Sequence, residues 1–176
     1  HSRSINSSPY EVGQDPDQFP LKEVRKAAIA ASNRGQKATE AIKVSLAHHD
    51  SAVRYWGAMG FVNRGRKTVT SNAELLRNEL NDPSFSVRVL AAEALGKIDP
   101  TSDLQQVRAV LIDAADLEKH NVWVAMLALN AIDELGPKAA PLLEQIRSLP
   151  QRNTVTPQRY RSYIPSLIKK IVSDLE

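Results

Sequence analysis

The chain has 176 residues, of which 42% are hydrophobic, 24% are charged and 5% are aromatic, a composition typical of a soluble, helix-rich protein. Lysine and arginine exceed aspartate and glutamate by only 23 to 20, which argues against a polybasic surface for nucleic acid. The absence of cysteine excludes disulfides and thiolate chemistry within these residues, and no apolar run approaches the roughly 18 residues of a membrane span.

Residues 1–20 are predicted to form an extended lead-in arm, because they are rich in serine, proline and other polar residues. The first helix is expected at residues 21–33, with Phe19 and Leu21 as anchors of the arm. Residues 21–176 are predicted to form one helical-repeat domain, in keeping with the length of the chain.

One pattern of apolar and small residues occurs three times. The stretch AVRYWGAMGF, which begins at Ala52, returns after 34 residues as SVRVLAAEAL and after a further 37 as WVAMLALNAI. These spacings are typical of helical repeats, and apolar residues of helical periodicity precede each copy, so the repeating unit is predicted to be a helical hairpin. The aligned apolar positions, all expected in the core, are Val53, Val87 and Val124; Trp56, Leu90 and Leu127; and Phe61, Leu95 and Ile132.

Small residues also recur in the three copies. A glycine inside a helix costs about 1 kcal/mol relative to alanine, yet the first copy has Gly57 and Gly60. Because alanines align with both in the later copies, we expect a stripe of small residues that lets paired helices approach closely. A hinge or a ligand contact is the alternative. The aligned alanines are Ala91 and Ala128, and Ala94 and Ala131.

Polar residues mark the expected helix ends. Asp50, Asp82 and Asn121 stand where the second helix of each hairpin should be capped, and Pro83 is suited to a first helical position. A last amphipathic helix is predicted near the C-terminus, where it would cap the open end of the stack. Its apolar residues are Ile164, Leu167, Ile168, Ile171 and Leu175, and the predicted helix stops are Gly65 and Gly136–Pro137.

Two groups of residues suggest chemistry. His48, His49 and Asp50 are metal-ligand types, but adjacent helical residues point about 100° apart, so a role at a helix end is favoured over a metal site. Asp133 and Glu134 could act as an acid–base pair, although neighbouring acids on a helix usually face solvent.

A third group suggests a binding surface. The tract from Arg64 to Thr68, which includes Arg66 and Lys67, could contact phosphate, sulfate or an acidic glycan, or form a solvated loop. Arg152, Arg159 and Arg161 could extend it. Tyr55 and Trp123 lie off the apolar face and are candidates for contact with a sugar or a peptide.

A hairpin whose second helix opens with aspartate and Val-Arg, followed by an alanine-rich stripe, resembles the HEAT repeat. The stretches that carry this resemblance are DSAVR, ending at Arg54, and DPSFSVR, ending at Arg88. It implies an all-α, right-handed superhelix of about four hairpins plus a terminal helix. It also implies a structural ladder that ties the turns of neighbouring repeats, formed by Asp50, Arg54, Asp82 and Arg88. The third copy has Ala125 in place of the arginine, so the ladder is expected to change there.

Nearly the whole chain also resembles the C-terminal region that follows the catalytic domain in a group of bacterial sulfatases related to arylsulfatases and heparan N-sulfatases. The strings concerned are SPYEVGQDPDQFPL, AVRYWGAMG, VRVLAAEALGKI and ALNAIDELGPKAAPLLEQI. The resemblance implies a non-catalytic accessory domain of a periplasmic or secreted enzyme, with the catalytic domain as its partner and with calcium in that absent domain. No catalytic, cofactor or metal residue is expected in this chain, because it lacks the Cys/Ser-x-Pro-x-Arg motif of those enzymes.

Two other functions fit a HEAT-like fold. A free-standing adaptor would bind a separate protein. A HEAT-like DNA glycosylase would need a strongly basic concave groove, which the charge balance disfavours. A membrane partner is not expected, and the small excess of basic residues argues against a nucleic-acid partner.

Overall fold

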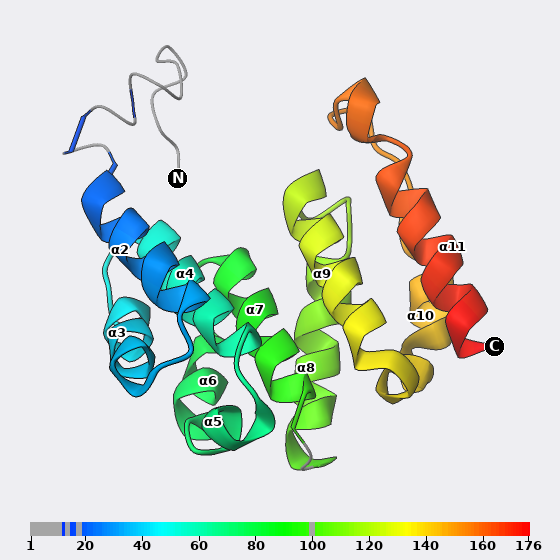
Figure 1. Cartoon of the computed structure of the whole chain (residues 1–176). Helices are drawn as coiled ribbons and strands as arrows, with labels where there is room; N and C mark the ends of the chain where they lie inside the picture. The colour runs from blue at the N-terminus through cyan, green and yellow to red at the C-terminus, as the bar shows by residue number, and fades with distance from the viewer. Residues whose placement is uncertain (1–11, 13–14, 17–18, 99–100) are drawn as a thin grey trace. The chain divides into compact units, whose positions relative to one another are not determined.

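The secondary structure in the described part of the chain is helical. This computed structural model describes residues 12, 15–16, 19–98 and 101–176, and those ranges contain no strand, which confirms the all-α class (Figure 1). The predicted lead-in arm falls mainly outside the described residues. Contacts divide the chain into two compact units, residues 1–63 and 64–176.

The first unit packs α2 (Leu21–Ser32), α3 (Gln36–Leu46) and α4 (Ser51–Val62) against one another. The observed bounds of α2 agree with the predicted first helix. Large side chains from α3 and α4 fill the core, and alanines of α2 let that helix approach them. The buried alanines and larger apolar residues of these helices are Ala27, Ala30, Ala31, Ile42, Leu46, Val53, Ala58 and Phe61. Leu21, predicted to anchor the arm, is instead exposed.

Gly57 lies where α4 meets α3. A Cβ atom added there would lie 2.9 Å from the backbone nitrogen of Leu46 and 3.0 Å from the carbonyl oxygen of Ile42. Real Cβ atoms essentially never come closer than 3.0 Å to such atoms, so α3 and α4 approach because this position has no side chain. The packing explanation is therefore confirmed at Gly57, and Gly60 is buried as well.

Trp56 is half-buried, so the prediction that it lies in the core is wrong. The buried positions Val53, Gly57 and Phe61 centre on a direction about 100° around the helix from Trp56. Trp56 therefore lies at the flank of the buried face, with its ring edge-on to that of Tyr55 at a centroid distance of 5.6 Å.

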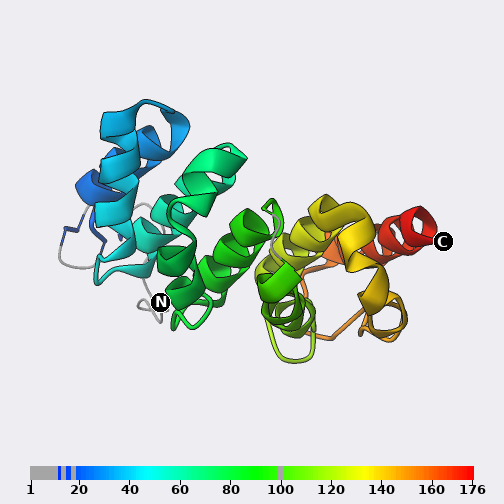
Figure 2. The ribbon, with the colours of Figure 1, turned by 90° about the horizontal axis from the view of Figure 1, so that it is seen from below.

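The second unit is a succession of helical hairpins, seen from a second direction in Figure 2. Helix α6 packs on α7, α8 packs on both α7 and α9, and α11 packs on α9. This order is that of an α-solenoid. The elements are α5 (Arg66–Thr70), α6 (Ala73–Glu79), α7 (Phe85–Gly96), α8 (Thr101–Ala114), α9 (Val122–Leu135), the 3₁₀ helix η1 (Gly136–Leu142), α10 (Leu143–Arg147), the 3₁₀ helix η2 (Gln158–Tyr160) and α11 (Tyr163–Leu175).

The repeat pattern accounts for most of the core of this unit. Val87, Leu90 and Leu95 of α7 are fully buried, as is Ile132 of α9, whereas Leu127 is half-buried. The four stripe alanines are also fully buried, which agrees with the predicted close packing: Ala91, Ala94, Ala128 and Ala131. The predicted last helix is α11, and its buried residues are Ile164, Ile168 and Ile171.

Two of the three predicted helix caps are confirmed. The Asp50 carboxylate accepts a hydrogen bond from the Ala52 amide at 2.7 Å. The Asn121 side chain accepts hydrogen bonds from the amides of Trp123 and Val124, at 3.0 and 3.1 Å. Asp82 differs, because it lies five residues before Val87 whereas Asp50 lies three before Val53.

The extra residues move the start of α7 along the chain. The Asp82 carboxylate therefore accepts from the Ser84 amide, at 2.6 Å, in the turn before the helix. Pro83 precedes the helix instead of opening it. Gly136 ends α9 as predicted, with a φ of 54° that favours glycine. Gly65 instead precedes the first residue of α5, while α4 ends at Val62 and Asn63 is its C-cap.

Candidate functional site

The two repeat arginines bind the turns of their own hairpins. Arg54 Nη1 donates to the carbonyl oxygens of His48, at 2.9 Å, and His49, at 2.8 Å. Arg88 Nε donates to the carbonyl oxygen of Asp82. In each turn the arginine therefore donates hydrogen bonds to backbone carbonyl oxygens, and the aspartate accepts a hydrogen bond from a backbone amide. These contacts are structural, and the further contact between neighbouring repeats stays a prediction.

Different residues join successive hairpins within the second unit. Arg77 of α6 forms a bidentate pair with the buried Asp103 of α8, with both distances at 2.9 Å. Arg108 Nε donates to the carbonyl oxygen of Lys138, and Lys138 Nζ donates to that of Gly96 at the end of α7, both at 2.8 Å. A cation is favourable at a helix C-terminus. The sequence pattern does not reveal these contacts, because the partners are 26 to 42 residues apart.

Three of the candidate metal ligands and acid–base residues, namely His48, Asp50 and Asp133, have structural partners. The Asp50 amide donates to His48 Nδ1 at 3.0 Å. The described residues contain no group of three histidine, aspartate or glutamate side chains placed to hold a metal ion. Asp133 accepts from Lys170 of α11 at 2.6 Å, and this bond, with a second to Asp174, raises the pKa of Lys170.

Glu93 is a titratable group that the sequence analysis did not single out. It lies on α7, largely buried, with Lys97 at 3.4 Å. Burial raises the pKa of Glu93 because it disfavours the charged carboxylate, and the nearby charge of Glu134 adds to the effect, while Lys97 partly opposes it.

Replacing Glu93 with glutamine is expected to raise the free energy of unfolding near neutral pH. Because the pKa is higher in the folded state, the ionised carboxylate opposes folding above that pKa, and the penalty disappears as the pH falls through it. The advantage of Glu93→Gln should therefore shrink on acidification in urea unfolding followed across pH. Glu118→Gln, at an exposed position, is the matched control. A Glu93→Gln advantage that grows on acidification would contradict this expectation.

The predicted basic tract does not form one surface. Arg64 is buried and takes part in interactions, so its assignment to an exposed surface is wrong. Arg66 and Lys67 are exposed, but on the short helix α5 and not in a loop. Figure 1 shows α7 and α8 between α5 and α9, the helix that carries Trp123 near its N-terminal end. Tyr55 is half-buried.

The structure instead brings Trp123 together with Tyr160 and Arg159. Its ring packs edge-on against Tyr160 at a centroid distance of 4.4 Å, and Tyr163 follows at 6.2 Å from Tyr160. The Arg159 guanidinium lies over the Tyr160 ring at 4.6 Å. We call this region the aromatic–arginine surface, and it comprises Trp123, Arg152, Arg159, Tyr160, Arg161 and Tyr163. The two tyrosines were missed, because no local pattern connects them with Trp123.

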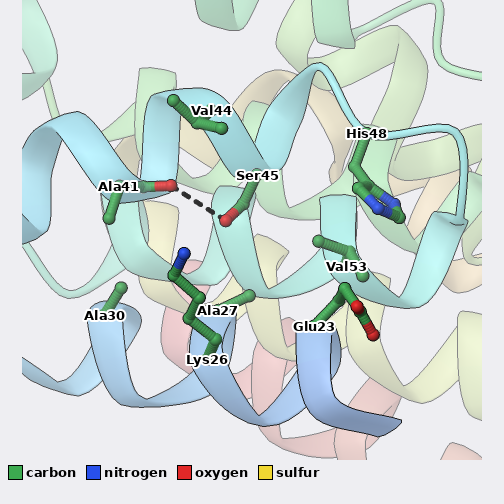
Figure 3. Close-up of a pocket in the computed structure, with 9 residues that line it drawn as sticks. All are labelled: Glu23, Lys26, Ala27, Ala30, Ala41, Val44, Ser45, His48 and Val53. Carbon is green, nitrogen blue, oxygen red and sulfur yellow. Dashed lines mark hydrogen bonds between the residues drawn. The ribbon is translucent and has the colours of Figure 1, made fainter. Parts of the chain in front are cut away.

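An apolar groove of about 220 Å³ lies between α2 and α3 in the first unit. Alanines form much of its wall, and the exposed Val44 of α3 lies along it, as Figure 3 shows. It is smaller than the roughly 300 to 1,000 Å³ of most ligand pockets. We call it the α2–α3 groove, and its lining residues are Glu23, Lys26, Ala27, Ala30, Ala41, Val44, Ser45, His48 and Val53.

Comparison with known families identifies the repeat region of the second unit. Residues 73–156 match the family model described as HEAT repeats. The HEAT-like region therefore runs from α6 past α10 and includes the second and third copies of the sequence pattern. Among curated proteins no significant match to the chain is found. No helix in the described ranges is long and apolar enough to cross a membrane.

Proposed function

We propose that the chain is a helical-repeat domain that binds a protein partner, and that this partner is the adjoining catalytic domain of a secreted or periplasmic bacterial sulfatase. The α2–α3 groove is the observation that carries the proposal. HEAT repeats are suited to protein interaction because stacked hairpins present extended surfaces. The catalytic domain would hold calcium and perform the hydrolysis, and this chain would support it.

The surface around the groove has the character of a protein interface. Val44, which lines the groove, is 74% exposed. Burying an apolar side chain of this size contributes about 1.5 to 3 kcal/mol. The alanine walls leave room for an apolar side chain of a partner. Glu23 and Lys26 supply charged groups beside this apolar centre, which is the usual arrangement in an interface.

The position of the groove in the sequence favours an adjoining domain. Residues 1–20 lead directly into α2, so a domain joined upstream would enter the structure beside the helix that forms one wall. Contacts between domains of one chain typically bury about 600 to 1,500 Å². The identity of that domain rests on the resemblance to sulfatase C-terminal regions, and the extracellular location rests on the same resemblance.

The test uses the native gene product with any upstream domain. Val44→Ser should lower the melting temperature of the catalytic domain and its turnover of a sulfated sugar, because the interface loses apolar contact. Val155→Ser, at another exposed valine, is the matched control and should change neither. The isolated chain should hydrolyse no aryl sulfate, with or without calcium.

The adaptor function makes a different prediction for the same groove. The match to HEAT repeats supports this alternative, because stacked helical repeats present surfaces that can bind a separate protein. If the native gene encodes no catalytic domain, and a separate protein loses binding in the Val44→Ser variant, the adaptor function replaces the accessory function. Hydrolysis by the isolated chain that survives repurification would overturn both.

A further inference from the structure

We propose that the aromatic–arginine surface of the second unit binds an anionic glycan, a sugar chain that carries sulfate or carboxylate groups. The proposal is independent of the α2–α3 groove and of the accessory function, because it rests on other residues in the other compact unit.

The segment from residue 151 to residue 163 is cationic. It contains three arginines and no aspartate or glutamate. Arg152 is exposed, and no described residue pairs with its side chain. Arg161 uses Nε to bind the carbonyl oxygen of Thr156, at 3.1 Å, while its Nη groups have no acceptor in the described part of the chain. A guanidinium can donate two parallel hydrogen bonds to a carboxylate or a sulfate, so these groups suit an anion.

A hollow of about 500 Å³ lies beside these arginines. Its lining consists of polar side chains without a carboxylate, namely Arg152, Asn153, Thr154, Gln158, Arg161 and Ser162. A peptide-binding groove usually offers apolar pockets for side chains. A lining of hydroxyl, amide and guanidinium groups instead matches a ligand rich in hydroxyl groups that also carries negative charge.

The loop that forms the hollow is held by internal hydrogen bonds. Asn153 Nδ2 donates to the carbonyl oxygen of Leu117 at 2.8 Å. Asn153 Oδ1 accepts from the amide and the hydroxyl of Thr156, at 2.8 and 2.7 Å, and Thr156 is buried. A loop fixed in this way loses little conformational entropy when a ligand binds.

Aromatic residues lie next to the lining residues in the sequence, with Tyr160 just before Arg161 and Tyr163 just after Ser162. Trp123 and Tyr163 are 54% and 48% exposed, and Tyr160 is fixed between Trp123 and Arg159. Exposed rings of tryptophan and tyrosine offer a flat apolar surface next to a polar group, which fits the C–H face of a sugar ring. Three arginines and a chain charge of +3 suit a short anionic segment better than the long phosphate backbone of a nucleic acid.

Isothermal titration calorimetry on the full chain tests the proposal. The probes are a heparin hexasaccharide, the same hexasaccharide after desulfation, neutral maltohexaose, a hexaglutamate peptide and a deoxythymidine hexamer. We expect the sulfated probe to bind most tightly, the desulfated probe to bind more weakly through its carboxylates, and maltohexaose to bind weakest. Affinity for the sulfated probe should fall as salt is added.

Substitutions then locate the site. Arg152→Gln with Arg161→Gln should weaken binding of the heparin hexasaccharide by at least about tenfold, since hydrogen bonds to charged groups contribute strongly. Arg25→Gln with Lys67→Gln removes the same charge from exposed positions elsewhere and should change affinity by no more than about twofold. Arg152→Gln alone, whose side chain supports no described contact, provides the test if the double variant has a lowered melting temperature.

Three results would overturn the proposal. The first is a dissociation constant weaker than about 1 mM for every glycan. The second is equal weakening by the control pair, which would indicate attraction to net charge alone. The third is tighter binding of hexaglutamate or the deoxythymidine hexamer than of the heparin hexasaccharide, which would assign the surface to an acidic protein or to a nucleic acid.

Discussion

Replacing Gly57 with alanine is expected to lower the free energy of unfolding by about 1 to 3 kcal/mol, the usual cost of overpacking. The new Cβ would meet backbone atoms of Leu46 and Ile42, which cannot rotate away. Helix propensity acts in the opposite direction and favours alanine by about 1 kcal/mol. A net loss therefore measures the steric effect, and Gly57→Leu should lose more. Urea unfolding measures both variants.

Gly65→Ala is the control for this substitution. A Cβ added at Gly65 meets nothing within 4 Å, and its φ of −74° suits alanine. The control should therefore cost less than about 1 kcal/mol, as expected for the position before a helix. If Gly57→Ala is as stable as the wild type, α3 and α4 do not approach as closely as the structure indicates.

Replacing Leu90 with alanine is expected to destabilise the second unit by about 2 to 5 kcal/mol. Leu90 is fully buried in α7, a helix packed by α6, α8 and α9. Truncation would remove buried methyl groups and leave a cavity that the surrounding helices can fill only in part. Chemical denaturation followed by circular dichroism measures the loss.

Leu127 is the matched control because it occupies the same position of the repeat. Its half-burial in α9 predicts a smaller loss for Leu127→Ala than for Leu90→Ala. Equal losses would indicate that the position in the repeat, and not the burial of the leucine side chain, determines the loss of free energy of unfolding.

The sequence predicts the elements of this fold well where local physics decides them. The helical periodicity of the apolar residues predicted the hairpins. The small residues aligned with Gly57 predicted the close packing of α3 and α4. Asp50 and Asn121 cap helices because an N-cap requires only a side chain near two or three following amides. Asp82 was misplaced because two extra residues separate it from the repeat pattern.

Features that depend on distant residues could not be predicted in the same way. The periodic pattern places Trp56 on the apolar face, but the precise direction of packing leaves it at the flank. Arg64 has a charged side chain in a polar tract, yet tertiary packing buries it. The contact between Trp123 and Tyr160 requires α9 and η2 to pack together, and the sequence of neither segment predicts this packing.

The two compact units each contain one of the two tryptophans of the chain, Trp56 in the first and Trp123 in the second. Repeat proteins gain stability mainly from contacts between neighbouring repeats, so distant parts of the chain need not melt together. In a Trp56→Phe variant the remaining indole fluorescence reports on the second unit alone, and in a Trp123→Phe variant it reports on the first. The chain thus carries a built-in optical label for each unit, and overlap of the two fluorescence curves measures how cooperatively they melt.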